Sequence, residues 1–192
     1  MKKLRLIPLI LVMCSIFVSG QDKDQSKELS KEKVALKIQY FGELVLHPGL
    51  SIGIDYTLLN TKRVSIHIDT DLGGFWHRWN NSSVFLKSSI GSKFDMGPIF
   101  TDITVGLGYM HSWSAGPLFE RTENGDIGKA KNNGNPHFIP NASFLIGWDT
   151  NNKKNKHSWR AFIGPEAFLQ SSYNHMFMPH LAAKIGITLK LF

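Results

Sequence analysis

Cysteine is nearly absent from this sequence of 192 residues, in which Cys14 is the only one. It lies inside the apolar run Leu6–Val18 near the start of the chain. If that run is removed on export, the mature chain has no thiol, which excludes disulfides, thiolate metal sites and cysteine nucleophiles. The alternative is a lipoprotein acylated on Cys14. The bulky Met13 before it and the apolar residues after it argue against that reading, and favour a cysteine acting as a small hydrophobe.

Long apolar runs are also missing, since none approaches the roughly 20 residues that a transmembrane helix needs. Leu6–Val18 is too short to span a bilayer, and a basic start precedes it at Lys2, Lys3 and Arg5. This order is typical of a secretory signal peptide, with small residues around Gly20 for cleavage. We therefore predict a signal peptide over residues 1–20 and a mature chain that is secreted, periplasmic or in the outer membrane.

No block of like charge occurs in the chain either. Removing residues 1–20 lowers the formal net charge from +7 to +4, and acidic and basic side chains are interspersed. This pattern excludes the basic patch that nucleic-acid binding requires. Residues 21–33 are charged and poor in apolar side chains, which predicts a flexible tail, with a short helix at a barrel mouth as the alternative. Residues 34–192 are one domain by length.

What the sequence does contain is alternation, clearest in Thr101–Trp113. Ile103, Val105 and Leu107 alternate with small or polar residues, a period of two that indicates a strand with one apolar face. That face ends in Tyr109 and Trp113. Aromatic side chains of this kind settle at a membrane–water interface. The interfacial aromatics predicted in this way are Tyr109, Trp113, Trp148 and Trp159.

Eight segments share the pattern, and together they predict an all-β fold: an eight-stranded antiparallel up-and-down transmembrane β-barrel. Longer loops are expected at His77–Ser83, Ser114–His137 and Ser171–Pro179, and a bulge or weakened pairing at Pro165. A soluble β-sandwich is the alternative, but it would not need aromatics at its strand ends. The predicted strands are Val34–Leu46, Leu50–Leu59, Arg63–Phe75, Val84–Phe94, Thr101–Trp113, Phe138–Asp149, Trp159–Gln170 and His180–Phe192.

The second face of these strands carries charged residues in near-equal numbers of acids and bases. An eight-stranded barrel is just wide enough for side chains to fill it, and each buried charge needs a partner. The sequence therefore predicts a plugged polar lumen with no open pore. The predicted lumen charge network is Lys37, Glu43, Asp55, His67, Asp69, Asp71, Lys87, Lys93, Asp102, Arg160, Glu166, Lys184 and Lys190.

With this signal, strand count and closing strand, the chain resembles the small eight-stranded outer-membrane barrels of Gram-negative bacteria. The closing segment Lys184–Phe192 resembles the C-terminal strand that the barrel assembly machinery reads in that class. In that class the strand ends in an aromatic residue that the machinery reads as a signal. Here Phe192 falls in the phase of Lys190, and the apolar phase ends in Leu191, which is the alternative residue for that signal. The resemblance implies an outer-membrane location, with outer-membrane lipids and lipopolysaccharide as the surroundings.

Some barrels of this class are lipid A deacylases of the PagL type, which use a His, a Ser two residues later and a downstream Glu. His111 has a matching position near the outer end of a strand. The residue two later is Trp113, and Ser112 and Ser114 point to the other face of a regular strand. Glu120 and Glu123 lie in a loop. His111 is therefore a weak catalytic candidate, and its alternative is an interfacial side chain between Tyr109 and Trp113.

Most histidines gather near the expected outer rim. Imidazole is a common metal ligand, so a metal-contacting or haem-contacting rim is a second alternative, although no pair has strong ligand spacing. The weak metal candidates are His47, His77, His137, His175 and His180.

Three functional classes remain from the sequence. The first, and the prediction, is a structural, interaction or accessory barrel that acts through its extracellular loops, with a larger outer-membrane protein as a possible partner. The second is a lipid-modifying enzyme and the third is a narrow channel. No motif requires a cofactor, and none identifies the ligand, the partner or the oligomeric state.

Overall fold

The computed structural model describes residues 33–44, 46–121, 126–150, 158–173 and 176–191. The predicted signal peptide, the tail up to residue 32, His175 and Phe192 lie outside these ranges, as do Glu123 and Cys14. Within the described residues, no helix is long and apolar enough to cross a membrane.

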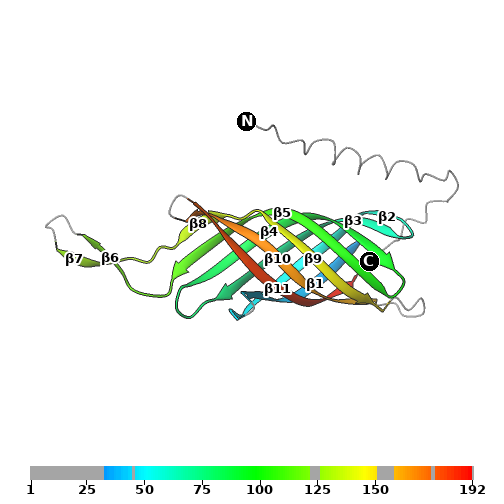
Figure 1. Ribbon diagram of the computed structural model, residues 1–192, viewed down its shortest axis with the longest axis horizontal. Helices are drawn as coiled ribbons and strands as arrows, with labels where there is room; N and C mark the ends of the chain where they lie inside the picture. The colour runs from blue at the N-terminus through cyan, green and yellow to red at the C-terminus, as the bar shows by residue number, and fades with distance from the viewer. Residues whose placement is uncertain (1–32, 45, 122–125, 151–157, 174–175, 192) are drawn as a thin grey trace, which may run out of the picture.

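The described chain is built from antiparallel strands (Figure 1). Their bounds are β1 (Val34–Glu43), β2 (Gly49–Asn60), β3 (Val64–Trp76), β4 (Asn81–Met96), β5 (Ile99–Ser114), β6 (Leu118–Arg121), β7 (Ile127–Ala130), β8 (Asn135–Phe138), β9 (Asn141–Asp149), β10 (Trp159–Tyr173) and β11 (Met176–Lys190).

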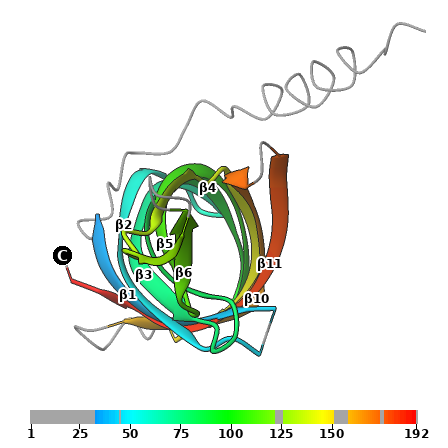
Figure 2. The same ribbon diagram turned by 90° about the vertical axis from the view of Figure 1, so that its left-hand side faces the viewer.

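Eight of these elements form the barrel wall, with β8 extending β9. The hydrogen-bonded order is β4-β3-β2-β1-β11-β10-β9-β5, and β5 pairs with β4 to close the ring (Figure 2). β8 and β9 pair with the same strand, β5, and are separated only by Ile139 and Pro140. The predicted fold class, a closed eight-stranded antiparallel barrel, is confirmed. Closure leaves the wall with no open sheet edge, which a bilayer would not tolerate.

The two ends of the barrel differ. At the end we call the terminal end, β1 begins and β11 finishes. The Leu191 amide donates to the Val34 carbonyl there at 2.9 Å. The opposite end, called the loop end, carries the hairpin of β6 and β7, which pair only with each other. In Figure 1 this hairpin extends well beyond the wall. Both chain ends of the barrel thus lie on one side, as an even strand number requires.

Outward and inward faces alternate as the period of two predicts. On β5 the outward Ile103, Val105 and Leu107 are 49%, 56% and 57% exposed, whereas the inward Asp102 and Thr104 are 5% and 4% exposed. A soluble sandwich would bury the apolar face instead. The apolar exterior is the surface that a hydrocarbon environment covers.

All three predicted longer loops contain strand, and the predicted loop Ser114–His137 holds β6, β7 and most of β8. The predicted loop His77–Ser83 is shorter because β4 begins at Asn81, and the predicted loop Ser171–Pro179 is mostly strand. β11 includes Pro179, because the pairing of β11 with β1 ends at Ala182 and Pro179 pairs only with Leu169 of β10. A proline is tolerated on such an edge.

Pro165 behaves as expected for a weakened pairing. It keeps its register with Ala183 of β11, but the ladder between β10 and β9 passes over Gly164 and Pro165 and resumes at Glu166. Proline has no amide hydrogen to donate there.

We expect Val105→Lys to destabilise the barrel, because it places a charge in the middle of the outward face. The free energy of unfolding should fall by about 2–4 kcal/mol, as measured by denaturant titration in lipid vesicles. Met96→Lys is the matched control at a strand end, where the loss should be about 0–1 kcal/mol. Equal losses at both positions would contradict a membrane-spanning outer face.

Candidate functional site

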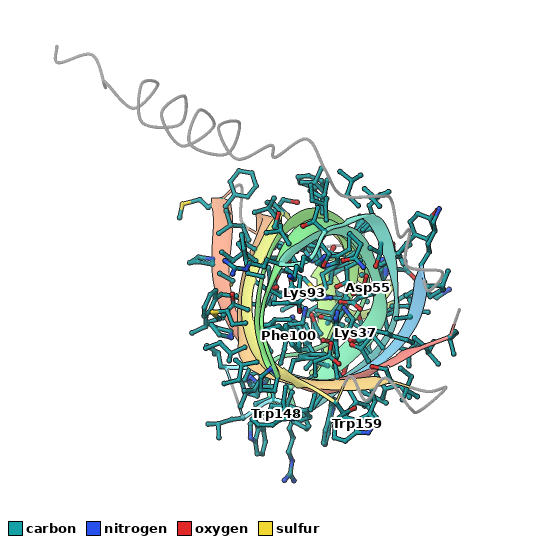
Figure 3. All side chains as sticks on the ribbon, turned by 90° about the vertical axis from the view of Figure 1, so that its right-hand side faces the viewer. Lys37, Asp55, Lys93, Phe100, Trp148 and Trp159 are labelled. Atoms are coloured by element: carbon teal, nitrogen blue, oxygen red, sulfur yellow. The ribbon has the colours of Figure 1, made fainter. Side chains whose placement is uncertain are left out.

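The interior of the barrel is filled by side chains in layers that differ in polarity. Looking in from the terminal end, Lys37, Asp55, Lys93 and Phe100 point inward, while Trp148 and Trp159 point outward (Figure 3).

The central ion cluster joins three lysines and three carboxylates: Lys37, Asp69, Asp71, Lys87, Glu166 and Lys184. Lys184 Nζ lies 3.0 Å from Glu166 Oε2 and 3.7 Å from Asp71 Oδ2, and Lys87 pairs with the other oxygen of Glu166. Lys37 pairs with Asp69 and lies 2.9 Å from Asp71 Oδ1. Every charge thus has an opposite partner, which offsets the cost of removing it from water.

A glycine makes room for this cluster. Gly53 faces inward, and a Cβ there would lie 3.0 Å from Lys37 Cε and overlap the Asp71 carboxylate. The glycines in the polar phase therefore leave space for long charged side chains from neighbouring strands.

A lower ion cluster lies nearer the terminal end and contains Asp55, His67, Lys93 and Asp102. Lys93 Nζ is 3.0 Å from Asp55 and 3.8 Å from Asp102, and His67 Nε2 is 3.4 Å from Asp102. All four side chains are buried.

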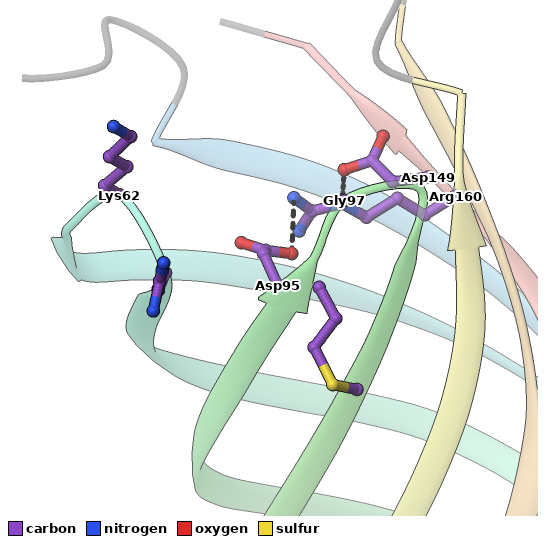
Figure 4. Close-up of a pocket in the computed structure, with 7 residues that line it drawn as sticks. Lys62, Asp95, Gly97, Asp149 and Arg160 are labelled. Atoms are coloured by element: carbon purple, nitrogen blue, oxygen red, sulfur yellow. Dashed lines mark hydrogen bonds and ion pairs between the residues drawn. The ribbon is translucent and has the colours of Figure 1, made fainter.

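The terminal mouth holds two further predicted lumen charges, Arg160 and Lys190, both half-buried. Arg160 lies 2.5 Å from Asp149 and 3.7 Å from Asp95, and Lys190 lies 3.9 Å from Asp149 (Figure 4 shows the two Arg160 pairs). A cleft of about 540 Å³ opens here, lined also by Lys62, Arg63 and Met96. Of the residues that line the cleft, Arg160 forms ion pairs with Asp95 and Asp149, and the others are exposed to solvent.

An apolar layer separates the central ion cluster from the loop end, and the sequence reading missed it. This aromatic layer consists of Phe41, Phe75, Phe85, Met110, Ile139, Phe168 and Ala182. The Phe41 and Phe85 rings are 4.8 Å apart, and Lys87 Nζ lies 4.3 Å from each ring centre. A smaller cluster of Phe100, Leu145 and Phe162 lies toward the terminal end. The available signal was phenylalanine recurring in the polar phase of several strands.

Above the aromatic layer, inward side chains at the loop end form a hydrogen-bonded chain that we call the rim network: Ser112, His137, Gln170, His180, Glu43 and His47. Ser112 Oγ is 2.8 Å from His137 Nε2, and Gln170 Nε2 is 3.0 Å from the same nitrogen. It links strands from both halves of the sequence across the mouth. The predicted lumen residue Glu43 belongs to this network.

Glu43 joins two histidines at one side of the mouth. His180 Nδ1 is 2.8 Å from Glu43 Oε1, and His47 Nδ1 is 2.5 Å from Glu43 Oε2. The His47 ring stacks on His77 at 3.5 Å. The metal candidates His47, His77 and His180 are therefore close together, and His137 is connected to them through Gln170. Across the described ranges, however, no group of three or more His, Cys, Asp or Glu side chains is arranged to hold a metal ion.

His111, the weak catalytic candidate, lies on the outer face. Its Nδ1 is 3.1 Å from the Tyr109 hydroxyl, its Nε2 is 3.1 Å from the Asn133 carbonyl, and its ring is 4.5 Å from that of Trp113. None of these contacts is with a serine. The histidine and serine spacing of the deacylases is not formed around His111.

Aromatic side chains mark both ends of the apolar exterior. Tyr109 is exposed and Trp113 half-buried at the loop end, whereas Trp148 and Trp159 are exposed at the terminal end. Trp76 and Trp79 add to the loop end. Two such belts flanking an apolar band are typical of membrane barrels.

A closed wall, an apolar exterior between aromatic belts and a polar, filled interior define the chain as a small transmembrane β-barrel. No protein-family model matches the sequence, and no curated protein matches it.

Solved structures resemble its strand arrangement only distantly. Neisserial surface protein A has 8% identity and a TM-score of 0.49, with 83% of this chain and 96% of that chain covered. The outer-membrane enzyme PagL has 10% identity and a TM-score of 0.49, with 82% and 99% covered. The N-terminal barrel domain of Pseudomonas aeruginosa OprF has 11% identity and a TM-score of 0.43, with 82% and 97% covered. Likenesses of this size carry no argument about activity.

We expect Glu166→Gln to destabilise the barrel strongly, because it leaves Lys87 without its carboxylate and Lys184 with only its longer contact. Breaking a buried pair from one side costs about 3–5 kcal/mol in the free energy of unfolding. Glu120→Gln in the exposed β6 is the control, with a change of about 0.5 kcal/mol or less. Adding Lys184→Met to Glu166→Gln should recover part of the loss. No recovery would contradict the pairing.

Proposed function

We propose that this protein is an outer-membrane barrel that conducts no ions and acts through its loop end, as an interaction or accessory protein at the cell surface. In this proposal the loop end faces outward, outer-membrane lipids and lipopolysaccharide surround the wall, and the barrel assembly machinery inserts it. The predicted signal peptide and the apolar exterior support the location. One candidate for the partner is a larger outer-membrane protein.

One observation carries the proposal: the β6–β7 hairpin extends beyond the wall and presents apolar side chains. Phe119 and Ile127 are 64% and 79% exposed. A two-stranded ribbon by itself is only marginally stable in water. Exposed apolar groups on an extended element, outside the membrane-facing wall, are typical of a surface that meets a partner.

The filled interior supports the absence of conduction. The aromatic layer lies across the path between the rim network and the central ion cluster, and Phe41 and Met110 are 1% and 0% exposed. The ion clusters beyond it are internally paired, so no row of charges is left to lead an ion through.

Photo-crosslinking in intact cells tests the interaction. A photoreactive residue at Phe119 should yield protein adducts, whereas the same residue at the outward Ile103 of β5 should yield lipid adducts only. Replacing residues 117–131 by a short Gly-Ser linker should leave a folded barrel, judged by its heat-dependent gel mobility, that no longer co-purifies with the crosslinked protein. Adducts that form equally at both positions would contradict the proposal.

Planar bilayer recordings test the filled interior. We expect no steady conductance from the wild-type protein. The triple variant Phe41→Ala, Phe85→Ala, Phe168→Ala thins the aromatic layer and should raise the frequency of brief openings. Steady wild-type currents would overturn the proposal in favour of a narrow channel.

A further inference from the structure

The rim network places a serine hydroxyl against an oriented histidine. Ser112 Oγ is 2.8 Å from His137 Nε2, and His137 Nδ1 is 2.7 Å from the backbone carbonyl of Ser171. A carbonyl can only accept, so Nδ1 carries the hydrogen and Nε2 is left as an acceptor for the Ser112 hydroxyl. A serine becomes a nucleophile when its hydroxyl contacts a base and a third group orients that base. Ser112, His137 and the Ser171 carbonyl are in contact in this order.

The rest of the network keeps His137 in its base form. Gln170 directs its amide nitrogen to His137 Nε2 at 3.0 Å and its amide oxygen to His180 Nε2 at 3.1 Å. His180 Nδ1 faces the Glu43 carboxylate at 2.8 Å. Both nitrogens of His180 therefore face oxygen acceptors. The Gln170 amide and the Ser112 hydroxyl both present hydrogen to His137 Nε2, which makes this nitrogen an acceptor.

We propose that Ser112 is a nucleophile toward small acyl esters, with His137 as its general base. The Ser112 oxygen bonds to the ester carbonyl carbon as its proton passes to His137 Nε2. The bond to the leaving alcohol then breaks, the alcohol takes that proton, and an acyl group remains on Ser112. Water, deprotonated by the same nitrogen, releases the acid. This activity is independent of the proposed surface interaction and of His111.

The surroundings of Ser112 define the substrate class. Met110 and Ile139 lie one step deeper than Ser112 and His137 on the inward face and are buried, so the interior directly below the nucleophile is apolar, which favours a short acyl group over a charged one. Ser83 lies opposite Ser112 in the β4–β5 register, is 2% exposed, and its hydroxyl has no hydrogen-bond partner. A spare hydroxyl beside the nucleophile is a donor for the carbonyl oxygen as charge develops on it.

A covalent probe tests the proposal on the folded full chain in detergent. A small alkyl fluorophosphonate should phosphonylate Ser112, with a phosphorus–oxygen bond replacing the phosphorus–fluorine bond and the proton leaving through His137. Peptide mass spectrometry then compares Ser112 with Ser51, a buried lumen serine that contacts Gln39 and no histidine. We expect labelling at Ser112 only, with a rate that falls as the buffer is made acidic.

His137→Gln should reduce the labelling rate by about 100-fold, the lower end of what general-base assistance contributes. His67→Gln makes the same change at another buried histidine, far from Ser112 along the barrel, and should leave the rate unchanged. Folding of each variant is checked by heat-dependent gel mobility. Labelling of wild-type Ser112 no faster than Ser51, a rate independent of pH, or an unchanged rate in folded His137→Gln would each overturn the proposal.

Discussion

The structure depends on the need of every inward charge for a partner from another strand. The interior of an eight-stranded barrel has no room for bulk water to solvate an isolated lysine, so the charges must neutralise one another. Lys87 of β4 meets Glu166 of β10 across the lumen, and Lys37 of β1 meets Asp69 and Asp71 of β3. The pair of Lys87 and Glu166 exists only once the wall has curved round to bring β4 and β10 face to face. Closure in turn supplies the backbone partners that a bilayer cannot provide. Charge pairing and closure therefore stabilise the same state, and each is incomplete without the other.

The sequence predicts the phase of each strand well because the period of two is a local property. It separates outward Val105 from inward Asp102 without knowledge of any neighbour, and the barrel class follows from eight such segments. The level of a side chain along the barrel axis is not a local property, because it is set by the register between strands and by closure of the wall. Lys87 and Glu166 are 79 residues apart, and nothing local indicates that they lie at one level. The aromatic layer was missed for the same reason. Phe41 and Phe85 are the single inward phenylalanines of their strands and Phe168 is one of two in β10, so they become a layer only when the register aligns them.

A filled interior leaves the two ends as the places where this barrel meets its surroundings, and the ends are unequal. At the terminal end the turns from β2 to β3 and from β4 to β5 are short, and Arg160 at the mouth lies between Asp95 and Asp149. At the loop end the chain between β5 and β8 leaves the wall to form a hairpin that the barrel does not need for closure. Residues that closure does not require are free to serve binding, and in this barrel they lie at the loop end.

The histidines show how far residue type alone misleads at such a rim. The sequence grouped His47, His77, His137, His175 and His180 as weak metal candidates and His111 as a weak catalytic candidate, and His175 lies outside the described residues. The structure divides them by face and by partner. His111 lies outside against Tyr109, His47 and His180 share Glu43, and His137 contacts a serine, an amide and a carbonyl. His111 and His137 each have one ring nitrogen at a hydroxyl and the other at a backbone carbonyl, but only the hydroxyl at His137 belongs to a serine. The chemistry available to a rim histidine is thus decided by which hydroxyl it meets, and for His137 that hydroxyl is on β5 while the carbonyl is on β10, strands that the closed wall brings together.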